Sequence, residues 1–422
     1  MSLPDGEKAA GADGTPDGDA TRVLTDRRLR ASAAITALAA RLVSIPSHVP
    51  SHDERGVAAA ILAAGGALGL GSGSMGGAVP EHPNVLFQLA GARPGPDVLV
   101  VGHMDTKPPG EVGAWDRPPY PAIVENGRLH GLGAADMKGA LSAMLHAAAT
   151  LRAGGLPARG RLTLAFTSDE EAEGRLGLPF LVEGGFVRPD MALICEPSGL
   201  AEPFDTVNVG SRGFFGFRLV AGGRRLHSSL TEPGSMTAIG ALSHVIDRLA
   251  DVVDFGGPFA APFEAGPTLN VATSLEAGVA AGIVPDVATA RGDVRTVAGQ
   301  TPADVVDALE RGLARLREAE PRLDISLIPD GDVWPPTTLD PATPIVGALV
   351  SATKRVTGRR PRLGSFPAST EAHALSSLGI PCVPAFGPGL LSAAHVPNES
   401  VSTGELTTAA TIYALALASL LS

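Results

Sequence analysis

The sequence predicts an α/β fold, in which a mostly parallel central sheet is flanked by helices and a smaller α+β domain is inserted into it. Residues 98–101, 161–167 and 191–195 form short, largely apolar runs, which are typical of strands buried inside a parallel sheet. Segments with helical periodicity lie between such runs. Residues 209–332 combine about four strand patterns with two helical ones, a ferredoxin-like arrangement. The length of 422 residues also favours two domains over one.

The first part of the chain supplies the predicted outer helices and the first strand. Apolar residues recur at helical spacing over residues 26–44 and again over residues 53–68. Residues 84–89 alternate between apolar and polar side chains, as a half-buried strand does. A further helix, rich in Ala and Leu, follows Gly139 and continues to about Arg152. No internal repeat is visible.

Composition argues against several classes of function. The net charge is −11 and the isoelectric point is about 5.4, which disfavours nucleic acid or an anionic membrane as the main partner. Cys195 and Cys382 lie in apolar surroundings, so we expect free thiols in a reducing compartment. No apolar run approaches membrane-spanning length, and residues 1–24 are expected to form a disordered tail rather than a targeting signal. We therefore expect a soluble, cytoplasmic protein.

Acidic and imidazole side chains follow the ends of the predicted strands. In chain order these are His103 and Asp105 after 98–101, Ser168-Asp-Glu-Glu171 after 161–167, Glu196 after 191–195 and His395 after 380–386, while Asp136 lies in a glycine-rich turn before a helix. Each has a plain structural interpretation, such as a polar strand end, a helix N-cap or acids that point into solvent. The carboxyl ends of parallel strands, however, meet where ligands bind, and adjacent acids there raise one another's pKa unless they point into solvent or a cation lies between them. The pattern therefore predicts a metal site.

The type of ligand limits the choice of metal. Two His and three carboxylates without a Cys suit Zn²⁺, Co²⁺ or Mn²⁺ rather than a structural thiolate zinc. An open catalytic zinc needs about three protein ligands. Five candidate ligands therefore favour two metals that share one carboxylate.

At these residues the chain resembles the acetylornithine deacetylase, succinyl-diaminopimelate desuccinylase and carboxypeptidase G2 family of zinc metallohydrolases. The motifs occur in order and span most of the chain: Gly102-His-Met-Asp-Thr106, Gly133-Ala-Ala-Asp-Met-Lys-Gly139, Ser168-Asp-Glu-Glu171, Cys195-Glu-Pro-Ser198, and Gly387-Pro-Gly389 with Ala394-His395. Gly131-Leu-Gly-Ala-Ala-Asp136 and Ser369-Thr-Glu-Ala372 are most similar to the acetylornithine deacetylase branch. The resemblance implies a zinc-peptidase-like catalytic domain with an inserted lid domain.

The same resemblance implies a role for each site residue. His103, Asp136 and Glu196 would hold one zinc, and Asp136, Glu171 and His395 the other, so that Asp136 bridges the two. Asp105 would hydrogen-bond His103, and Glu170 would be the general base. The implied reaction is attack of a metal-activated water on an amide carbonyl.

The inserted domain resembles the family's lid, which also forms dimers. The expected division is catalytic domain over 25–208, lid over 209–332 and catalytic domain again over 333–422. In the lid, His227 would stabilise the reaction's oxyanion, often in the partner subunit's site; a surface loop histidine is the alternative. Arg295 would bind a substrate carboxylate, and a structural arginine at the core edge is the alternative. A homodimer through the lid is the expected assembly.

Two departures from the family pattern stand out. Gly282 occupies a position where the family usually has Asn, and Lys107 follows the His103 motif where a small apolar residue is usual. Neither is a predicted metal ligand. The resulting hypothesis is a deacetylase acting on N-acyl amino acids, N-acetylornithine-like substrates first. The alternatives are a desuccinylase, a carboxypeptidase or dipeptidase of the same family, and an inactive metal-binding homologue.

Overall fold

A computed structural model describes residues 32–422 apart from residues 52 and 264. The predicted tail over residues 1–24 lies outside the described residues, and so does the start of the helix predicted over 26–44. The described part of that helix is Ser32–Val43.

The central sheet has the strand order β1-β2-β6-β3-β7-β18. Its strands are β1 (Ser74–Gly76), β2 (Asn84–Ala90), β3 (Arg93–His103), β6 (Arg159–Thr167), β7 (Met191–Ile194) and β18 (Cys382–Val383). The pairs β3–β6, β3–β7 and β7–β18 are parallel, while β1 and β2 add an antiparallel edge. The predicted α/β class with a mostly parallel core is confirmed, with this edge making the sheet mixed.

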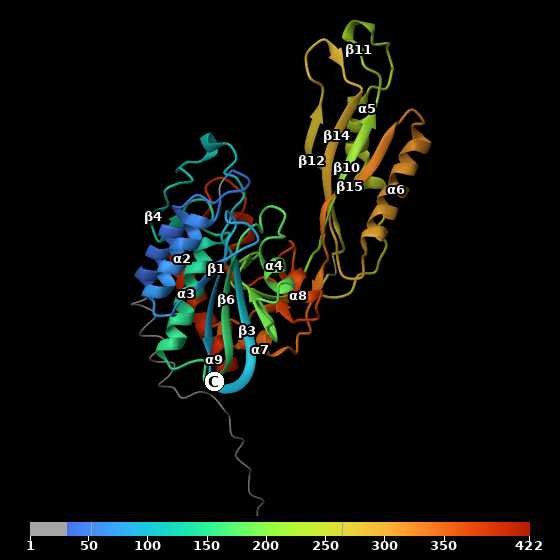
Figure 1. Cartoon of the computed structure of the whole chain (residues 1–422). Helices are drawn as coiled ribbons and strands as arrows, with labels where there is room; N and C mark the ends of the chain where they lie inside the picture. Colours follow the sequence, from blue (N-terminus) through green and yellow to red (C-terminus); the bar gives the residue numbers. More distant parts are fainter. Residues whose placement is uncertain (1–31, 52, 264) are drawn as a thin grey trace, which may run out of the picture.

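Helices cover both faces of this sheet. They are α2 (Arg55–Ala67), α3 (Lys138–Ala153), α7 (Pro344–Thr357) and α9 (Thr403–Leu421) in the larger cluster, and α4 (Leu178–Glu183) and α8 (Ala372–Ser376) in the smaller one. Val98 and Val100 of β3 belong to the larger cluster, whereas Leu99 and Val101 belong to the smaller one. This explains the unbroken apolar run, because both faces of β3 are buried. Figure 1 shows the sheet between these helices.

Helix α9 corrects one expectation from the sequence. It is 19 residues long with a mean hydropathy of 1.4, so its length and composition are sufficient for a membrane span. In the structure 61% of that segment is buried, and it packs against α3 and α7. Tyr413 of α9 also donates a hydrogen bond to Phe386 O at 2.9 Å. A core helix of the catalytic domain has these properties.

Three small sheets accompany the central sheet. They are β8 (Pro197–Gly199) with β19 (Gly387–Leu390); β9 (Thr206–Ser211) with β16 (Thr337–Thr338) and β17 (Arg362–Phe366); and β4 (Ile123–Glu125) with β5 (Arg128–His130) and β20 (Ser400–Ser402). The parallel β8–β19 pair brings the segment after Glu196 beside the segment that leads to His395. Residues far apart in the sequence are thereby joined.

The lid follows the order β-α-β-β-α-β. Its elements are β10 (Phe214–Gly222), α5 (Ala238–Val252), β12 (Thr268–Ala277), β14 (Val287–Arg295), α6 (Pro302–Ala319) and β15 (Ile325–Trp334). The antiparallel sheet order β12-β14-β10-β15 is the ferredoxin-like arrangement that the sequence predicts. A short β11–β13 pair, Leu226–His227 with Ile283–Val284, lies at the end of the lid farthest from the central sheet (Figure 1). The domain boundaries at 208/209 and 332/333 stay predictions.

Candidate metal centre

One group of possible metal ligands lies at the carboxyl ends of β3 and β7. Nε2 of His103 is 3.1 Å from Asp136 Oδ1 and 3.4 Å from Glu196 Oε1. All three residues are buried, and their ligand atoms lie within 4.8 Å of one another. His103 ends β3 and Glu196 follows its parallel neighbour β7, so the sheet itself brings them together.

A second group shares Asp136. Nε2 of His395 is 3.3 Å from Asp136 Oδ2 and 3.0 Å from Glu171 Oε1. Asp136 therefore directs one oxygen toward each imidazole. A third group, His103 with Glu170 and Glu171, meets the same 4.8 Å limit. The division into two ligand sets with Asp136 as the bridge matches the first two groups and stays a prediction.

The side chains of the first two groups fit divalent transition-metal ions. Ligand atoms at about 2.0–2.2 Å from a tetrahedral zinc are roughly 3.3–3.6 Å apart. The imidazole–carboxylate separations in these groups span 3.0–3.4 Å. Burial raises the pKa of Glu196 to about 7, and the charge of Asp136 adds to that effect. Burial disfavours a charged His395, yet Asp136 and Glu171 raise its pKa to about 11. The cluster therefore has an excess of negative charge that bound cations would balance.

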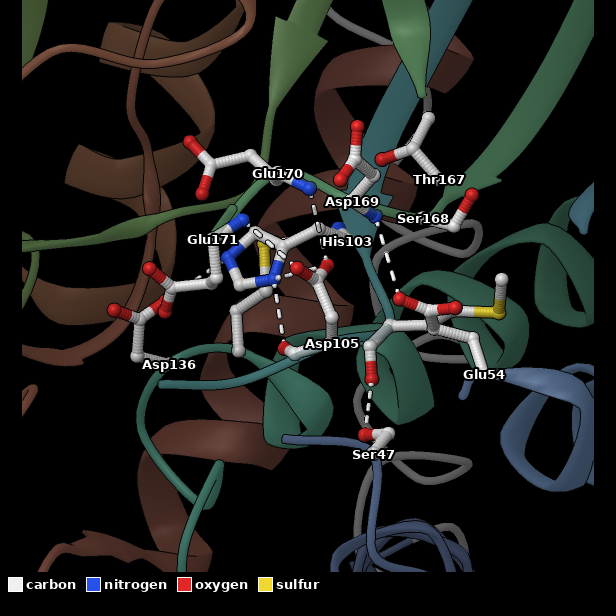
Figure 2. Close-up of polar contacts among 12 residues, drawn as sticks. Ser47, Glu54, His103, Asp105, Asp136, Thr167, Ser168, Asp169, Glu170 and Glu171 are labelled. Atoms are coloured by element: carbon white, nitrogen blue, oxygen red, sulfur yellow. Dashed lines mark hydrogen bonds and ion pairs between the residues drawn. The ribbon is translucent and has the colours of Figure 1, made fainter. Parts of the chain in front are cut away.

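Asp105 is placed differently from the expectation. The atom within hydrogen-bond distance of His103 Nδ1 is the backbone oxygen of Asp105, at 3.0 Å, while its carboxylate Oδ1 is 3.6 Å away. The carboxylate instead accepts the backbone N–H of Glu170 at 3.3 Å and of Glu171 at 2.8 Å (Figure 2). Asp105 thus orients His103 through its main chain and the Glu170–Glu171 loop through its side chain.

The three consecutive acids have three different environments. Asp169 turns away from the metal groups, and its Oδ2 accepts the backbone N–H of Arg175 and of Leu176, each at 3.0 Å. Glu170 lines the cleft beside the cluster, where burial raises its pKa well above the ordinary value and the charges of Glu196 and Glu171 add to the effect, against that of His103. Glu171 belongs to the second metal group. Figure 2 shows the three carboxylates pointing apart, which limits their mutual repulsion.

Sequence reasoning misses Glu399, which holds the turn that carries Asp136. Its Oε1 accepts the backbone N–H of Ala135 at 2.8 Å and of Asp136 at 3.0 Å, and its Oε2 accepts that of Gly133 at 2.9 Å. Burial raises the pKa of Glu399 to about 8, although the backbone hydrogen bonds oppose this. The β5–β20 pairing places Glu399 beside the turn. The only feature of the sequence that could point to Glu399 is its spacing from His395, and that spacing does not indicate a metal ligand.

Two further buried charged residues lie behind the centre. Lys138 is fully buried and donates from Nζ to Ile45 O at 2.7 Å; burial lowers its pKa to about 7, against the effect of Glu399. Glu54 pairs with His82 Nδ1 at 2.7 Å, and burial raises its pKa to about 7. Neither residue lines the cleft in the described structure.

Asp136, Glu171, Glu196 and His395 line a cleft of about 880 Å³ between the catalytic domain and the lid. Arg295, at the end of β14, lies on its lid side. Its guanidinium pairs with Asp293 Oδ1 at 3.1 Å, donates to Ser369 Oγ at 3.3 Å and lies over the Phe214 ring, 5.0 Å from the centroid. The predicted substrate-binding residue therefore faces the same cleft as the metal ligands.

His227 is not brought to this cleft. It lies in β11 at the far end of the lid, is exposed, and its Nδ1 is 2.8 Å from Ser229 Oγ (Figure 1). Gly282 lies opposite it, before β13, with φ +83° and its carbonyl accepting Ser228 N–H at 2.9 Å. A left-handed conformation favours glycine and, among side chains, Asn. The departure at Gly282 therefore preserves the turn.

Lys107 lies on the cleft wall beside Glu171. Its ammonium donates a hydrogen bond to Glu171 O and is 3.3 Å from Glu171 Oε2. Burial alone would lower the pKa of Lys107, but the charges of Glu171 and Glu170 raise it above its ordinary value.

Comparison with known proteins places this geometry in a family. The family model for peptidase family M20/M25/M40 matches residues 99–419, a range that contains both metal groups and the lid. The chain belongs to this family. It is a metal-dependent hydrolase that acts on amide bonds. The family resemblance stated from the motifs is thereby confirmed.

Two curated relatives that are similar over most of the chain are named succinyl-diaminopimelate desuccinylase. One, from Gluconacetobacter diazotrophicus, is 29% identical over 93% of this chain and 98% of its own length. Another, from Rhizorhabdus wittichii, is 30% identical over 89% and 95%. The preference for the acetylornithine deacetylase branch, which the short motifs suggested, stays a prediction.

Solved structures of M20 proteins share the fold. Human carnosine dipeptidase 1 is similar with a TM-score of 0.77 at 17% identity, covering 96% of this chain and 100% of that chain. A dinuclear metal-binding peptidase of Bacillus subtilis has a TM-score of 0.65 at 16% identity, covering 95% and 99%. Their agreement with both domains confirms the fold class, catalytic domain and lid together.

Proposed function

We propose that the chain hydrolyses the amide bond of an N-acyl amino acid. The observation that carries this proposal is the arrangement of the cleft: Glu170 and the two metal groups lie on its catalytic side, and Arg295 lies on its lid side. A scissile amide and a free carboxylate are the two groups of an N-acyl amino acid that such a cleft can recognise together.

Two divalent cations, Zn²⁺ in our proposal with Co²⁺ or Mn²⁺ as substitutes, fit the residues present. His103, Asp136 and Glu196 would hold one, and Asp136, Glu171 and His395 the other. When bound, such cations lower the pKa of water and polarise a carbonyl oxygen.

A side chain of the protein then accepts and releases the proton of the attacking water. Glu170 lies within 4.8 Å of His103 and Glu171 ligand atoms, so its carboxylate can accept a proton from the attacking water. The same carboxylate can pass that proton to the departing amine nitrogen. Buried surroundings favour its protonated form between the two steps, as burial disfavours the charged carboxylate.

Arg295 is proposed to bind the carboxylate of the amino acid. Its planar guanidinium suits a bidentate carboxylate contact, and its side chain is held by Asp293 and Phe214. About a third of the side chain, 32%, is exposed to solvent, and the residue lines the cleft. We expect the substrate carboxylate to bind at that exposed edge.

The acyl group is proposed to be small, with N-acetylornithine-like substrates first. The similarity of Gly131-Leu-Gly-Ala-Ala-Asp136 to the deacetylase branch supports an acetyl group. A second candidate is a succinyl group, because the curated relatives at 29–31% identity are named desuccinylases.

One assay tests the proposal. The purified protein, loaded with Zn²⁺ or Co²⁺, is incubated with N-acetylornithine, N-succinyl-diaminopimelate, other N-acyl amino acids and dipeptides, and the released amine is measured. Release from free acids but weak release from their carboxamide analogues supports both the reaction and Arg295. No release from any substrate while two cations are bound per chain overturns the proposed function.

The lid is proposed to form a homodimer, in which His227 acts in the partner's cleft. Its distance from the cleft of its own chain supports this arrangement, because an oxyanion-stabilising histidine has to reach a substrate. Exposed apolar residues cluster at the same end of the lid: Leu230 is 68% exposed and Val279 is 81% exposed. Such a patch suits association with another subunit.

A further inference from the structure

Lys107 contacts both the backbone and the side chain of Glu171. Its Nζ donates to the backbone oxygen of Glu171 and lies 3.3 Å from the carboxylate oxygen Oε2. The other carboxylate oxygen, Oε1, is 3.0 Å from His395 Nε2 and belongs to the second metal group. The Glu171 carboxylate thus lies between an ammonium and a cation position, with one oxygen facing each.

Among the residues that the structure describes, the first metal group has no equivalent of Lys107. Its terminal carboxylate, Glu196, is 3.4 Å from His103 Nε2. Over the described part of the chain, no lysine or arginine nitrogen lies within ion-pair distance of Glu196. The two groups therefore have similar ligands but different charges next to them.

An ammonium next to one oxygen of a carboxylate weakens the attraction of the other oxygen for a cation. Two positive charges on the same carboxylate repel; Glu171 is only 6% exposed, which favours the repulsion, while solvent at the 40% exposed side chain of Lys107 screens part of it. Lys107 also helps to orient Glu171, which favours metal binding. Asp105 Oδ2 already fixes the Glu171 backbone at 2.8 Å, so removing Lys107 leaves the ligand in place. The repulsion is therefore the larger effect.

We propose that Lys107 weakens cation binding at the Asp136–Glu171–His395 group and so makes the two cation positions unequal in affinity. The inference rests on the metal centre of the proposed function, but not on its substrate. Binding of a substrate carboxylate by Lys107 is the competing role. It is disfavoured because the ammonium already contacts two Glu171 oxygens.

The test is a metal titration of the apoprotein with Zn²⁺ or Co²⁺, using a chelator of known affinity as competitor and no substrate. Lys107→Met keeps most of the side-chain volume and removes the charge. We expect the weaker of the two dissociation constants to decrease about tenfold or more, the size typical of residues that contact a metal ligand. The tighter constant is expected to change less than about threefold. Lys107→Arg and the remote control Lys354→Met, an exposed residue of α7, are expected to match the wild type.

A second pair of variants assigns the effect to one position. His395→Ala removes a ligand of the second group, so a single constant is expected, and adding Lys107→Met to it should leave that constant unchanged. The proposal is overturned if Lys107→Met, shown to be folded by its circular dichroism, leaves the weaker constant unchanged or increases it. It is also overturned if the constant shifts equally in the His395→Ala background. Loss of hydrolysis with no change in either constant would assign Lys107 to substrate binding instead.

Discussion

The Asp105 carboxylate accepts the backbone N–H of Glu171, with Oδ2 2.8 Å from that nitrogen. The main-chain oxygen of the same residue lies 3.0 Å from His103 Nδ1. Asp105 therefore connects a candidate ligand of the first metal group to one of the second. Its carboxyl is buried, and burial raises its pKa to about 6.

Asp105→Asn is expected to weaken cation binding by about 10- to 100-fold. An amide keeps one acceptor oxygen, and its NH₂ group faces a backbone N–H that needs an acceptor. The main-chain contact to His103 is retained, so we expect both cations still to bind at high concentration. A titration with Co²⁺ measures the change. Wild-type affinities in the variant would show that the side chain of Asp105 does not position Glu171.

Glu170→Gln is expected to keep both cations and to lower kcat by about 10²- to 10⁴-fold, the contribution of a general acid–base. Glutamine has nearly the same shape but cannot accept the proton. Metal content and steady-state kinetics are measured on the same preparation. Glu183→Gln, on the exposed side of α4, is the matched control. Loss of one cation in Glu170→Gln would instead assign Glu170 as a ligand, as the His103–Glu170–Glu171 group allows.

Glu399→Gln is expected to lower cation affinity, although Glu399 is not a candidate ligand. Its carboxylate accepts three backbone N–H groups of the turn before α3, and an amide can satisfy only the two that meet at one oxygen. The turn then no longer holds Asp136 in a single position. The visible absorption of the Co²⁺ form is the readout, because it reports ligand geometry. An unchanged spectrum with reduced thermal stability would limit Glu399 to a structural role.

Mixing two inactive variants tests the proposed role of His227 in the partner subunit. Glu170→Gln and His227→Ala dimers are each expected to have low activity. After subunit exchange, a mixed dimer contains one cleft with an intact Glu170 and an intact His227 from the other subunit. We expect activity to recover in proportion to the mixed dimers formed. Absence of recovery, with exchange verified by mass spectrometry, would contradict a shared site.

The sequence predicted the parts of the site that follow from strand periodicity. His103 and Glu196 meet because parallel β3 and β7 end at the same edge, which an apolar run followed by a ligand residue reveals. Asp136 and His395 lie on loops, and their residue types already placed them with the strand-end residues among the candidate ligands; the family motifs added the division into two ligand sets. The strand and helix patterns over residues 209–332 predicted a ferredoxin-like lid, and the structure has that arrangement.

Contacts between loops were beyond sequence reasoning. The side chains of Glu399 and Lys138 are buried and bond to backbone atoms of other segments. Neither residue has a spacing or residue type that indicates such a contact. The sequence could not show whether His103 bonds to the side chain or to the main-chain oxygen of Asp105, because both lie beside the imidazole. The length of the apolar segment in α9 was underestimated. Small residues give this helix a high mean hydropathy without a long run of large apolar side chains.

Anomalous diffraction at the zinc edge, from crystals of the zinc-loaded protein, tests whether two cations share Asp136. We expect two peaks on opposite sides of the Asp136 carboxylate, one bound by His103 and Glu196 and the other by Glu171 and His395. A single peak, or a cation held by His103, Glu170 and Glu171, would contradict it.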